Sequence, residues 1–189
     1  MNQTAQSWWF IFYKDQLLLE KKEDGIYAIP CGESSPIVIK EKTTVHNITT
    51  LEGRNCKAFS LSSPIEESEQ WIMIGLRASY EYLPLSHYQT AGKAHEILHW
   101  DRNSRFCSAC GTPMEQKESI MKRCPKCDRE VYPSISTAIL VLVRKKDSLL
   151  LVHARNFKGT FNSLVAGFLE TGETLEECVA REVKEETGL

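Results

Sequence analysis

Apolar residues in the first half of the chain form short runs separated by polar turns, which is typical of a domain rich in β-strands. We expect strands at residues 8–13, 17–19, 37–39 and 71–74. From residue 85 to residue 100 the apolar spacing changes to three and four, and a helix is expected there. No apolar run has the roughly 18 residues that a membrane span needs, and we expect no membrane partner. The first residues lack a basic segment, and we expect no signal peptide.

The second half continues this mixture of strands and helix. Residues 135–143 and 148–152 read as a hairpin around the polar segment 144–147, and residues 161–165 read as another short strand. Thr174 and Glu177 have the spacing of a capping box, which predicts a helix from Leu175, and Gly188 is a typical stop. The chain is therefore expected to have an α+β fold.

Composition and charge narrow the class of protein. Hydrophobic residues make up 42% and charged residues 25%, which excludes a disordered or low-complexity chain. A net charge of -2 leaves no overall basic excess for nonspecific nucleic-acid binding. The charge is uneven, since residues 102–129 hold seven bases and three acids while residues 167–189 hold seven glutamates and two bases. This asymmetry indicates an anionic ligand held near metal-binding carboxylates, or simply two solvated faces.

Four of the seven cysteines have the spacing of a metal site: Cys107, Cys110, Cys124 and Cys127. Two CxxC pairs 13 residues apart are typical of tetrahedral zinc with four thiolate ligands. Such a closed shell has no open position for water, so a structural role is expected. Two redox-active pairs are the alternative, but these pairs lie in a turn-rich stretch rather than between a strand and a helix. The odd count favours a reducing cytoplasm, and Cys31, Cys56 and Cys178 have no assigned role.

Three glutamates cluster on the predicted last helix. Glu182, Glu185 and Glu186 occupy positions i, i+3 and i+4, and mutual repulsion would raise their pKa values unless a cation neutralises them. At about 100° per residue, Glu186 falls on the apolar arc, where an unpaired carboxylate would be costly. Oxygen ligands favour Mg2+ or Mn2+ over zinc. Surface glutamates at a helix end are the alternative. The arc itself consists of Leu175, Val179 and Val183.

The segment from Gly167 to Leu189 resembles the complete Nudix box. Its fixed positions are Gly167, Glu173, Arg181, Glu182, Val183, Glu185, Glu186, Gly188 and Leu189. With a four-cysteine ribbon upstream and Tyr132-Pro133 between, the chain is similar to the NADH pyrophosphatase branch. The resemblance implies three domains: an N-terminal Nudix-like α/β domain (1–100), a zinc ribbon (101–131), and the first part of a Nudix α/β/α sandwich (132–189). It is carried by residues from about 75 onward and more weakly by those before them.

The resemblance also implies roles for individual residues. Glu182, Glu185, Glu186 and the carbonyl of Ala166 would bind Mg2+ or Mn2+. Arg181 would orient the glutamates, with Glu173 as an intermediary, while Tyr132 would contact the nucleotide. Glu118 and Arg77 are looser matches to substrate-contacting residues, and an ordinary surface charge is the alternative for both. The chain departs from the family at Ser134 and Thr137, where Arg and Pro are frequent.

The implied reaction is hydrolysis of the pyrophosphate bond of NADH or NAD+ to NMN(H) and AMP, with NAD-cap removal from RNA as a related activity. A homodimer is also implied. The chain stops where the family continues with further strands, a helix, a substrate-selecting motif and another metal-binding glutamate, so we expect a truncated form with weak or no activity. The alternatives are a zinc-ribbon nucleic-acid-binding protein with an inactive Nudix domain and a nucleotide sensor that does not cleave.

Overall fold

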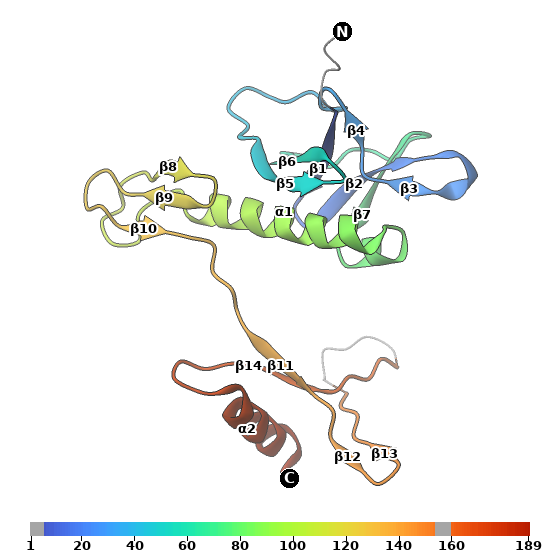
Figure 1. Cartoon of the computed structure of the whole chain (residues 1–189), viewed down its shortest axis with the longest axis vertical. Coiled ribbons are helices and arrows are strands. Elements are labelled where there is room, and N and C mark those ends of the chain that lie inside the picture. The colour runs from blue at the N-terminus through green and yellow to red at the C-terminus, as the bar shows by residue number, and fades with distance from the viewer. Residues whose placement is uncertain (1–5, 154–159) are drawn as a thin grey trace. The chain divides into compact units, whose positions relative to one another are not determined.

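A computed structural model describes residues 6–153 and 160–189. The chain divides into two compact units, Met1–Pro133 and Ser134–Leu189 (Figure 1). The first unit therefore holds both the segment predicted as the N-terminal domain and the segment predicted as the ribbon. The N-terminal five residues, where we expected no signal peptide, lie outside the described part. Within the described ranges, no helix is long and apolar enough to cross a membrane.

The first unit is built on a seven-stranded sheet with the order β3-β2-β1-β6-β5, in which β4 also pairs with β1 and β7 with β2 (Figure 1). The pairing of β1 with β6 is parallel and the other pairings are antiparallel. One short 3-10 turn, Glu23–Gly25, connects β2 to β3, and a second, Ala78–Glu81, follows β7. The strands are β1 (Ser7–Tyr13), β2 (Gln16–Lys21), β3 (Tyr27–Ala28), β4 (Cys31–Gly32), β5 (His46–Leu51), β6 (Arg54–Ser60) and β7 (Trp71–Gly75).

Strand β1 is buried on both faces because its side chains alternate between two apolar clusters. Phe10 and Phe12 join the cluster that packs against the long helix. Trp9 and Ile11 join the second cluster on the opposite face, together with Phe59. A strand that is buried on both sides explains the unbroken apolar run in the sequence, which a half-exposed strand would not show.

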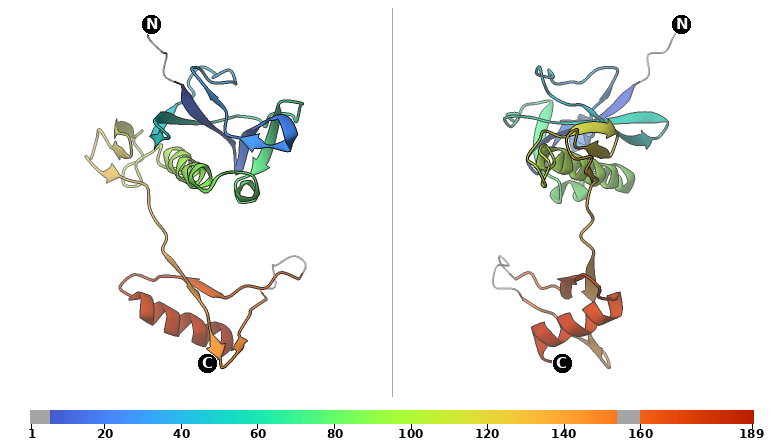
Figure 2. Two further views of the ribbon diagram at one scale, coloured as in Figure 1. Left: turned by 45° about the vertical axis from the view of Figure 1, so that its right-hand side comes forward. Right: turned by 90° about the vertical axis from the view of Figure 1, so that its left-hand side faces the viewer.

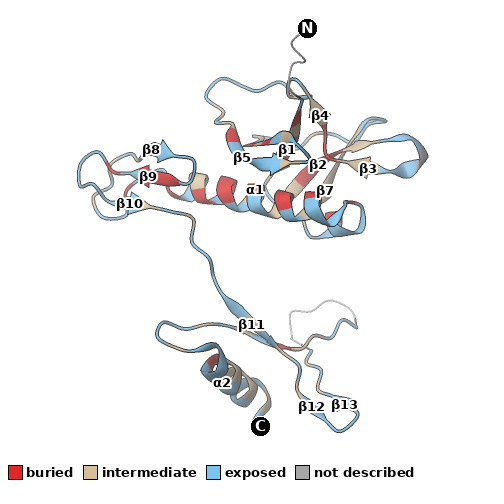
Figure 3. Cartoon of the chain, viewed as in Figure 1, coloured by how far each residue is buried: buried red, intermediate tan, exposed pale blue. Residues whose placement is uncertain are grey.

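Helix α1 (Leu85–Asn103) lies along one face of this sheet, as both views in Figure 2 show. Its buried side includes Ala91, Ala94, Ile97 and Leu98, which are the positions that the sequence spacing predicts. The small alanines let the helix approach the sheet closely, and Figure 3 shows the buried positions of the first unit concentrated on α1 and the central strands. The helix ends where the Ser104 hydroxyl donates to the Trp100 carbonyl over 2.6 Å.

The ribbon follows α1 and consists of a three-stranded sheet of order β10-β9-β8, with β8 at Glu115–Glu118, β9 at Met121–Arg123 and β10 at Glu130–Val131. Buried Lys122 connects it to α1. The Lys122 ammonium lies 2.6 Å from a carboxylate oxygen of Asp101 and donates to the Asp101 carbonyl over 2.8 Å. His46 Nε2 lies 3.3 Å from the other Asp101 carboxylate oxygen, close enough for an ion pair but not aligned as a hydrogen bond. One carboxylate thus ties β5, α1 and the ribbon together.

Contacts with His46 and Lys122 lower the pKa of Asp101 to about 2, from an ordinary value of 3.8. A lowered folded-state pKa stabilises the protein above pH 4, and this contribution is lost as the pH falls from about 4 to 2. We expect Asp101→Asn to reduce the free energy of unfolding by about 2 kcal/mol at pH 7. Urea unfolding of the unmodified protein and of Asp101→Asn would measure this difference in the free energy of unfolding, and the difference should become smaller between pH 4 and pH 2. Glu66→Gln, at an exposed site, is the matched control, and an equal gap at every pH would contradict the prediction.

The described part of the second unit, residues 134–153 and 160–189, contains one two-stranded sheet, one short hairpin and one helix. Strand β11 (Ala138–Val141) pairs antiparallel with β14 (Val165–Phe168), and helix α2 (Leu175–Thr187) packs against both. The hairpin consists of β12 (Arg144–Lys145) and β13 (Ser148–Leu149). Val165 is fully buried, whereas the hairpin residues are exposed (Figure 3).

The mixed α+β class is confirmed, but several predicted strands are wrong. Residues 37–39 form no strand, because the Ser35 hydroxyl bonds both the amide and the carbonyl of Ile37 and holds a local turn. The hairpin predicted around 144–147 is confirmed but short, since β12 pairs with β13 and the Leu150 amide donates to the Val143 carbonyl over 2.9 Å. The rest of the strand predicted at 135–143 is confined to β11, which pairs with β14 instead. The strand predicted at 161–165 begins only at Val165. Strands β5 and β6 were not predicted, because their apolar residues alternate with polar ones too irregularly.

Candidate functional site

The two CxxC segments of the ribbon form the same turn twice. The Gly111 amide donates to the Cys107 carbonyl over 2.9 Å, and the Asp128 amide donates to the Cys124 carbonyl over 3.0 Å. Gly111 and Asp128 both have left-handed backbones, with φ of 70° and 58°. Glycine adopts this conformation without cost, and aspartate tolerates it better than most residues. Each turn therefore presents its two cysteine side chains to the same point.

The four sulfurs are arranged as tetrahedral zinc requires. Their atoms all lie within 4.8 Å of one another, and the closest pairs are Cys110–Cys124 at 3.5 Å, Cys107–Cys127 at 3.6 Å and Cys110–Cys127 at 3.7 Å. Zinc–sulfur bonds of about 2.3 Å imply sulfur separations of about 3.8 Å in a regular tetrahedron. The Thr112 hydroxyl and amide lower the pKa of the Cys110 thiol to about 6, which favours the thiolate. The predicted structural zinc site is supported by this geometry.

Helix α2 begins at the capping box that its sequence predicts. The Thr174 hydroxyl accepts from the Glu177 amide over 3.2 Å, and the Glu177 carboxylate accepts from the Thr174 amide over 2.8 Å. Gly188 closes the helix with a left-handed φ of 74°. The capping box and Gly188 fix the residues at which the helix begins and ends. They therefore help to determine which of its side chains face β14.

Arg181 is the centre of a hydrogen-bond network on the side of α2 that faces β14. It donates to the two carboxylate oxygens of Glu173 over 2.9 and 3.0 Å and to the Phe168 carbonyl over 3.1 Å. It also donates to Glu182 over 2.8 Å and to Glu185 over 3.3 Å. A planar guanidinium with five N–H donors can bond several groups at once, which a lysine could not do.

The loop before α2 strengthens this network. Arg181, together with the Glu170 amide 3.1 Å away, lowers the pKa of Glu173 to about 2. The hydrogen bonds that Arg181 donates to Glu173 and Glu182 in turn raise the pKa of Arg181 further above its ordinary value. The ionised pair joins the loop to the helix, as we expected from the resemblance, and leaves one oxygen of Glu182 and one of Glu185 without a bond to Arg181.

Glu182 lies against the backbone of β14 at Gly167. A side chain at Gly167 would place its Cβ 1.9 Å from the Glu182 carboxyl group. Glycine lets the Glu182 carboxyl group approach the strand this closely, at a position that the Nudix box also fixes as glycine. Ala166 precedes Gly167 in β14, so the predicted metal-binding carbonyl lies one residue from the backbone that Glu182 approaches.

We expect Gly167→Ala to displace the Glu182 carboxylate while leaving the fold intact. The clash involves the end of a flexible side chain, so the free energy of unfolding should change by less than about 1 kcal/mol. Titration calorimetry with Mn2+ should show affinity weakened by about tenfold or more, because one ligand is moved. Gly92→Ala, where a Cβ meets open space, is the control. Unchanged Mn2+ affinity in Gly167→Ala would separate Glu182 from metal binding.

One prediction about α2 is wrong. Glu186 and the arc on which it lies are not buried: Glu186 is exposed and Leu175 is 50% exposed. The single fully buried residue of the helix is Cys178, which packs beside the Phe168 carbonyl. The face toward β14 is thus centred on Cys178 and Arg181. Apolar periodicity could not find it, because the contact is made by a thiol and a salt-bridge network.

The three box glutamates do not form a compact cluster in the structure. Among the described residues, the four cysteines are the only group of three or more Asp, Glu, His or Cys side chains whose ligand atoms all lie within 4.8 Å of one another. Glu182 and Glu185 share the Arg181 guanidinium, whereas Glu186 has no ion pair or hydrogen bond within the described ranges. The carboxylates nevertheless occupy one side of one helix, and their oxygen donors suit Mg2+ or Mn2+.

The predicted substrate contacts lie in the first unit and are mostly exposed. The Tyr132 hydroxyl donates to Glu130 over 3.1 Å, and Glu130 also bonds Arg123. Glu118 ends β8, and Arg77 precedes the turn Ala78–Glu81. Sequence reasoning missed Glu130, which holds Tyr132; its position two residues before the tyrosine was the only signal. The roles of these residues remain predictions.

Family comparisons agree with this architecture. Residues 6–100 match an NADH pyrophosphatase-like rudimentary NUDIX domain, residues 102–132 an NADH pyrophosphatase zinc ribbon domain, and residues 133–189 a NUDIX domain. The chain belongs to the NADH pyrophosphatase-like branch of the Nudix family.

Several similar proteins are NAD-capped RNA hydrolases named NudC. The chain is 38% identical to that of Chromobacterium violaceum over 124 residues, which are 65% of this chain and 46% of the relative. It is 35% identical to that of Pseudomonas aeruginosa over 146 residues, 76% of this chain and 52% of the relative. With that of Klebsiella pneumoniae the identity is 30% over 185 residues, 97% of this chain and 67% of the relative. The chain thus spans about half the length of the first two relatives.

Proposed function

We propose that the protein hydrolyses the pyrophosphate bond of NADH or NAD+, giving NMN(H) and AMP, and that it removes NAD caps from RNA by the same reaction. The observation that carries the proposal is the Arg181 network, which holds Glu182 and Glu185 on one side of α2 with Gly167 against Glu182. Its similarity to NAD-capped RNA hydrolases supports the same reaction for this chain.

Mg2+ or Mn2+ would be held by Glu182, Glu185, Glu186 and the Ala166 carbonyl. Such ions neutralise pyrophosphate charge and lower the pKa of bound water. The chain's own contribution is positioning: Arg181 fixes two carboxylates through one guanidinium, and Glu173 fixes Arg181. In the reaction, the oxygen of water bonds to phosphorus and the bridging phosphorus–oxygen bond breaks. Tyr132, Glu118 and Arg77 would contact the nucleotide.

The zinc ribbon as an RNA-binding module is less favoured. Three of the seven bases in residues 102–129 already form ion pairs: Lys117 with Glu115, Lys122 with Asp101, and Arg123 with Glu130. This leaves fewer unpaired basic residues for RNA than the sequence count indicates.

The cysteines support a reducing cytoplasm as the location of the protein. Four of them are suited to bind zinc, and none of the seven forms a disulfide. A homodimer stays a prediction, which sedimentation velocity would test.

Product analysis tests the proposal. NADH and a 5′-NAD-capped RNA are incubated with the protein and Mn2+, and the products are separated by chromatography. We expect NMNH and AMP from NADH, and a 5′-monophosphate RNA from the capped RNA. The assay uses the 189-residue chain and, if the coding frame continues past Leu189, the longer product as well. Nicotinamide release, or RNA binding without cleavage by the longer product, would contradict the proposed reaction.

A further inference from the structure

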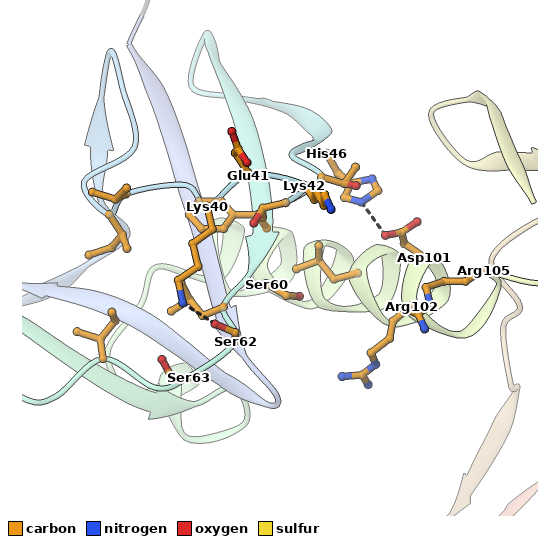
Figure 4. A pocket seen from close by; sticks show the side chains of 18 residues that line it. Lys40, Glu41, Lys42, His46, Ser60, Ser62, Ser63, Asp101, Arg102 and Arg105 are labelled. Carbon is orange, nitrogen blue, oxygen red and sulfur yellow. Dashed lines mark hydrogen bonds and ion pairs between the residues drawn. The ribbon is translucent and has the colours of Figure 1, made fainter. Parts of the chain in front are cut away.

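The first unit contains a pocket of about 540 Å3 that the proposed hydrolysis does not use. Its walls come from residues 37–46, from the end of β6 with the turn after it, and from the last part of α1 (Figure 4). Its floor is apolar: Phe59 and Leu98 are buried, and Ile37, Leu61 and Ile65 are half-buried. The volume is in the range of pockets that hold small ligands.

Four cations surround this floor. Lys40, Lys42, Arg102 and Arg105 are exposed, and none of them forms an ion pair with a carboxylate in the described part of the chain. Lys40 donates to the Ser62 hydroxyl over 2.9 Å, and the Arg105 guanidinium lies 5.8 Å from the centre of the Phe106 ring. Figure 4 shows Arg102 and Arg105 at the end of α1 and Lys40 reaching toward Ser62. Unpaired cations gathered around one pocket produce a positive potential within it.

The acidic residues at the pocket do not cancel this charge. Asp101 is already paired with Lys122 and with His46, as the dashed contact in Figure 4 shows for His46. Glu41 is exposed and forms no ion pair with a described base. Four cations against these two carboxylates leave the lining positive by two charges, with His46 counted as neutral. Hydroxyl groups of Ser60, Ser62 and Ser63 add neutral hydrogen-bond donors beside the cations.

We propose that this pocket binds a nucleoside phosphate, with the phosphate at the cationic rim and the base on the apolar floor. Arginine presents a planar fork of N–H donors that matches phosphate oxygens, and lysine adds a point charge. An apolar floor offers a flat base a surface from which water is excluded. The same chemistry is found in a free mononucleotide and in one unit of an RNA strand. The site lies entirely within the first unit, requires no divalent metal, and is independent of the proposed hydrolysis.

Binding to the 189-residue chain tests this assignment without added Mg2+ or Mn2+. The probes are ATP, followed by calorimetry, and a labelled oligoadenylate of about ten nucleotides, followed by fluorescence anisotropy. Lys40→Gln with Arg102→Gln should weaken binding of the preferred probe by about tenfold or more. The matched control, Lys14→Gln with Lys93→Gln, removes two exposed charges outside the pocket and should change the affinity by less than about twofold. Circular dichroism checks that all variants fold.

The outcomes separate the two sources of the ligand. Tight ATP binding with no gain for the oligonucleotide identifies a free nucleotide, while an oligonucleotide that binds about tenfold tighter identifies an RNA strand. Either result supports the pocket. Glu186→Gln should bind both probes as tightly as the unmodified chain does, because the pocket lies within the first unit and Glu186 does not. Binding of the probes to the pocket would therefore stand even if the protein did not hydrolyse NADH. Absence of binding to both probes, or equal losses in the pocket and control variants, would overturn the assignment.

Discussion

Replacing Glu186 by glutamine lowers kcat for NADH hydrolysis by about three orders of magnitude in the active protein, if the proposed function is correct. The substitution removes one negative charge and an anionic metal ligand while keeping the size of the side chain. Glu186 is exposed and has no partner within the described residues, so the fold should not depend on it. Steady-state kinetics with Mn2+ would show the loss in kcat, and thermal unfolding should give an unchanged Tm.

Glu176→Gln provides the matched control for this experiment. Glu176 lies in the first turn of the same helix and is also exposed, but it is not one of the three box glutamates. Its replacement should leave kcat within about twofold. A loss of less than about tenfold in Glu186→Gln would place Glu186 outside metal coordination. The proposal would then rest on Glu182 and Glu185 alone.

Removing the zinc should unfold the ribbon. Structural zinc contributes about 10–16 kcal/mol of apparent binding free energy in small zinc domains. Apart from the metal site, the ribbon is stabilised by a sheet of only three short strands. We expect one zinc per chain by elemental analysis, and loss of that zinc in Cys110→Ser. Because Lys122 joins the ribbon to α1 at Asp101, the first unit should also become less stable to urea.

Cys31→Ser is the control for the zinc prediction. Cys31 is a half-buried free thiol in β4, apart from the four clustered sulfurs, and its replacement should retain the full zinc content. The redox alternative predicts a different pattern. Intramolecular disulfides that form and break reversibly, with no zinc in the purified protein, would show that the CxxC pairs are redox centres.

The sequence predicted elements well where one local rule determined them. The capping box at Thr174 and the stop at Gly188 fixed both ends of α2, and the alanine spacing in α1 identified its buried side. Prediction failed where a turn formed by a side chain, or pairing with distant strands, overrides the apolar pattern. Residues 37–39 are apolar enough for a strand, yet Val38 is 87% exposed and a serine turn organises the segment. Strand β6 is stabilised by pairing with β1, and β5 by pairing with β6, which no local window of the sequence shows.

The candidate site was predictable in its residues but not in its geometry. Fixed positions identified Arg181 and the glutamates, and the CxxC spacing identified the four zinc ligands. The sequence did not show that one guanidinium bonds Glu173, Glu182 and Glu185 together, because that depends on where the loop crosses the helix. Nor did it indicate the cationic pocket, whose lysines and arginines are about 60 residues apart in the chain and meet only in the fold.

The position of β1 at the middle of its sheet has a consequence for how the chain folds during synthesis. This strand is made before its partners, since its parallel neighbour β6 ends at Ser60 and the helix that covers one of its faces ends at Asn103. Its aromatic residues therefore stay exposed until segments far along the chain have been synthesised. Contacts of long sequence separation also form slowly. Nascent chains that end before α1 would expose Phe10 and Phe12 and should associate with chaperones or aggregate, whereas chains that include Asn103 can bury them.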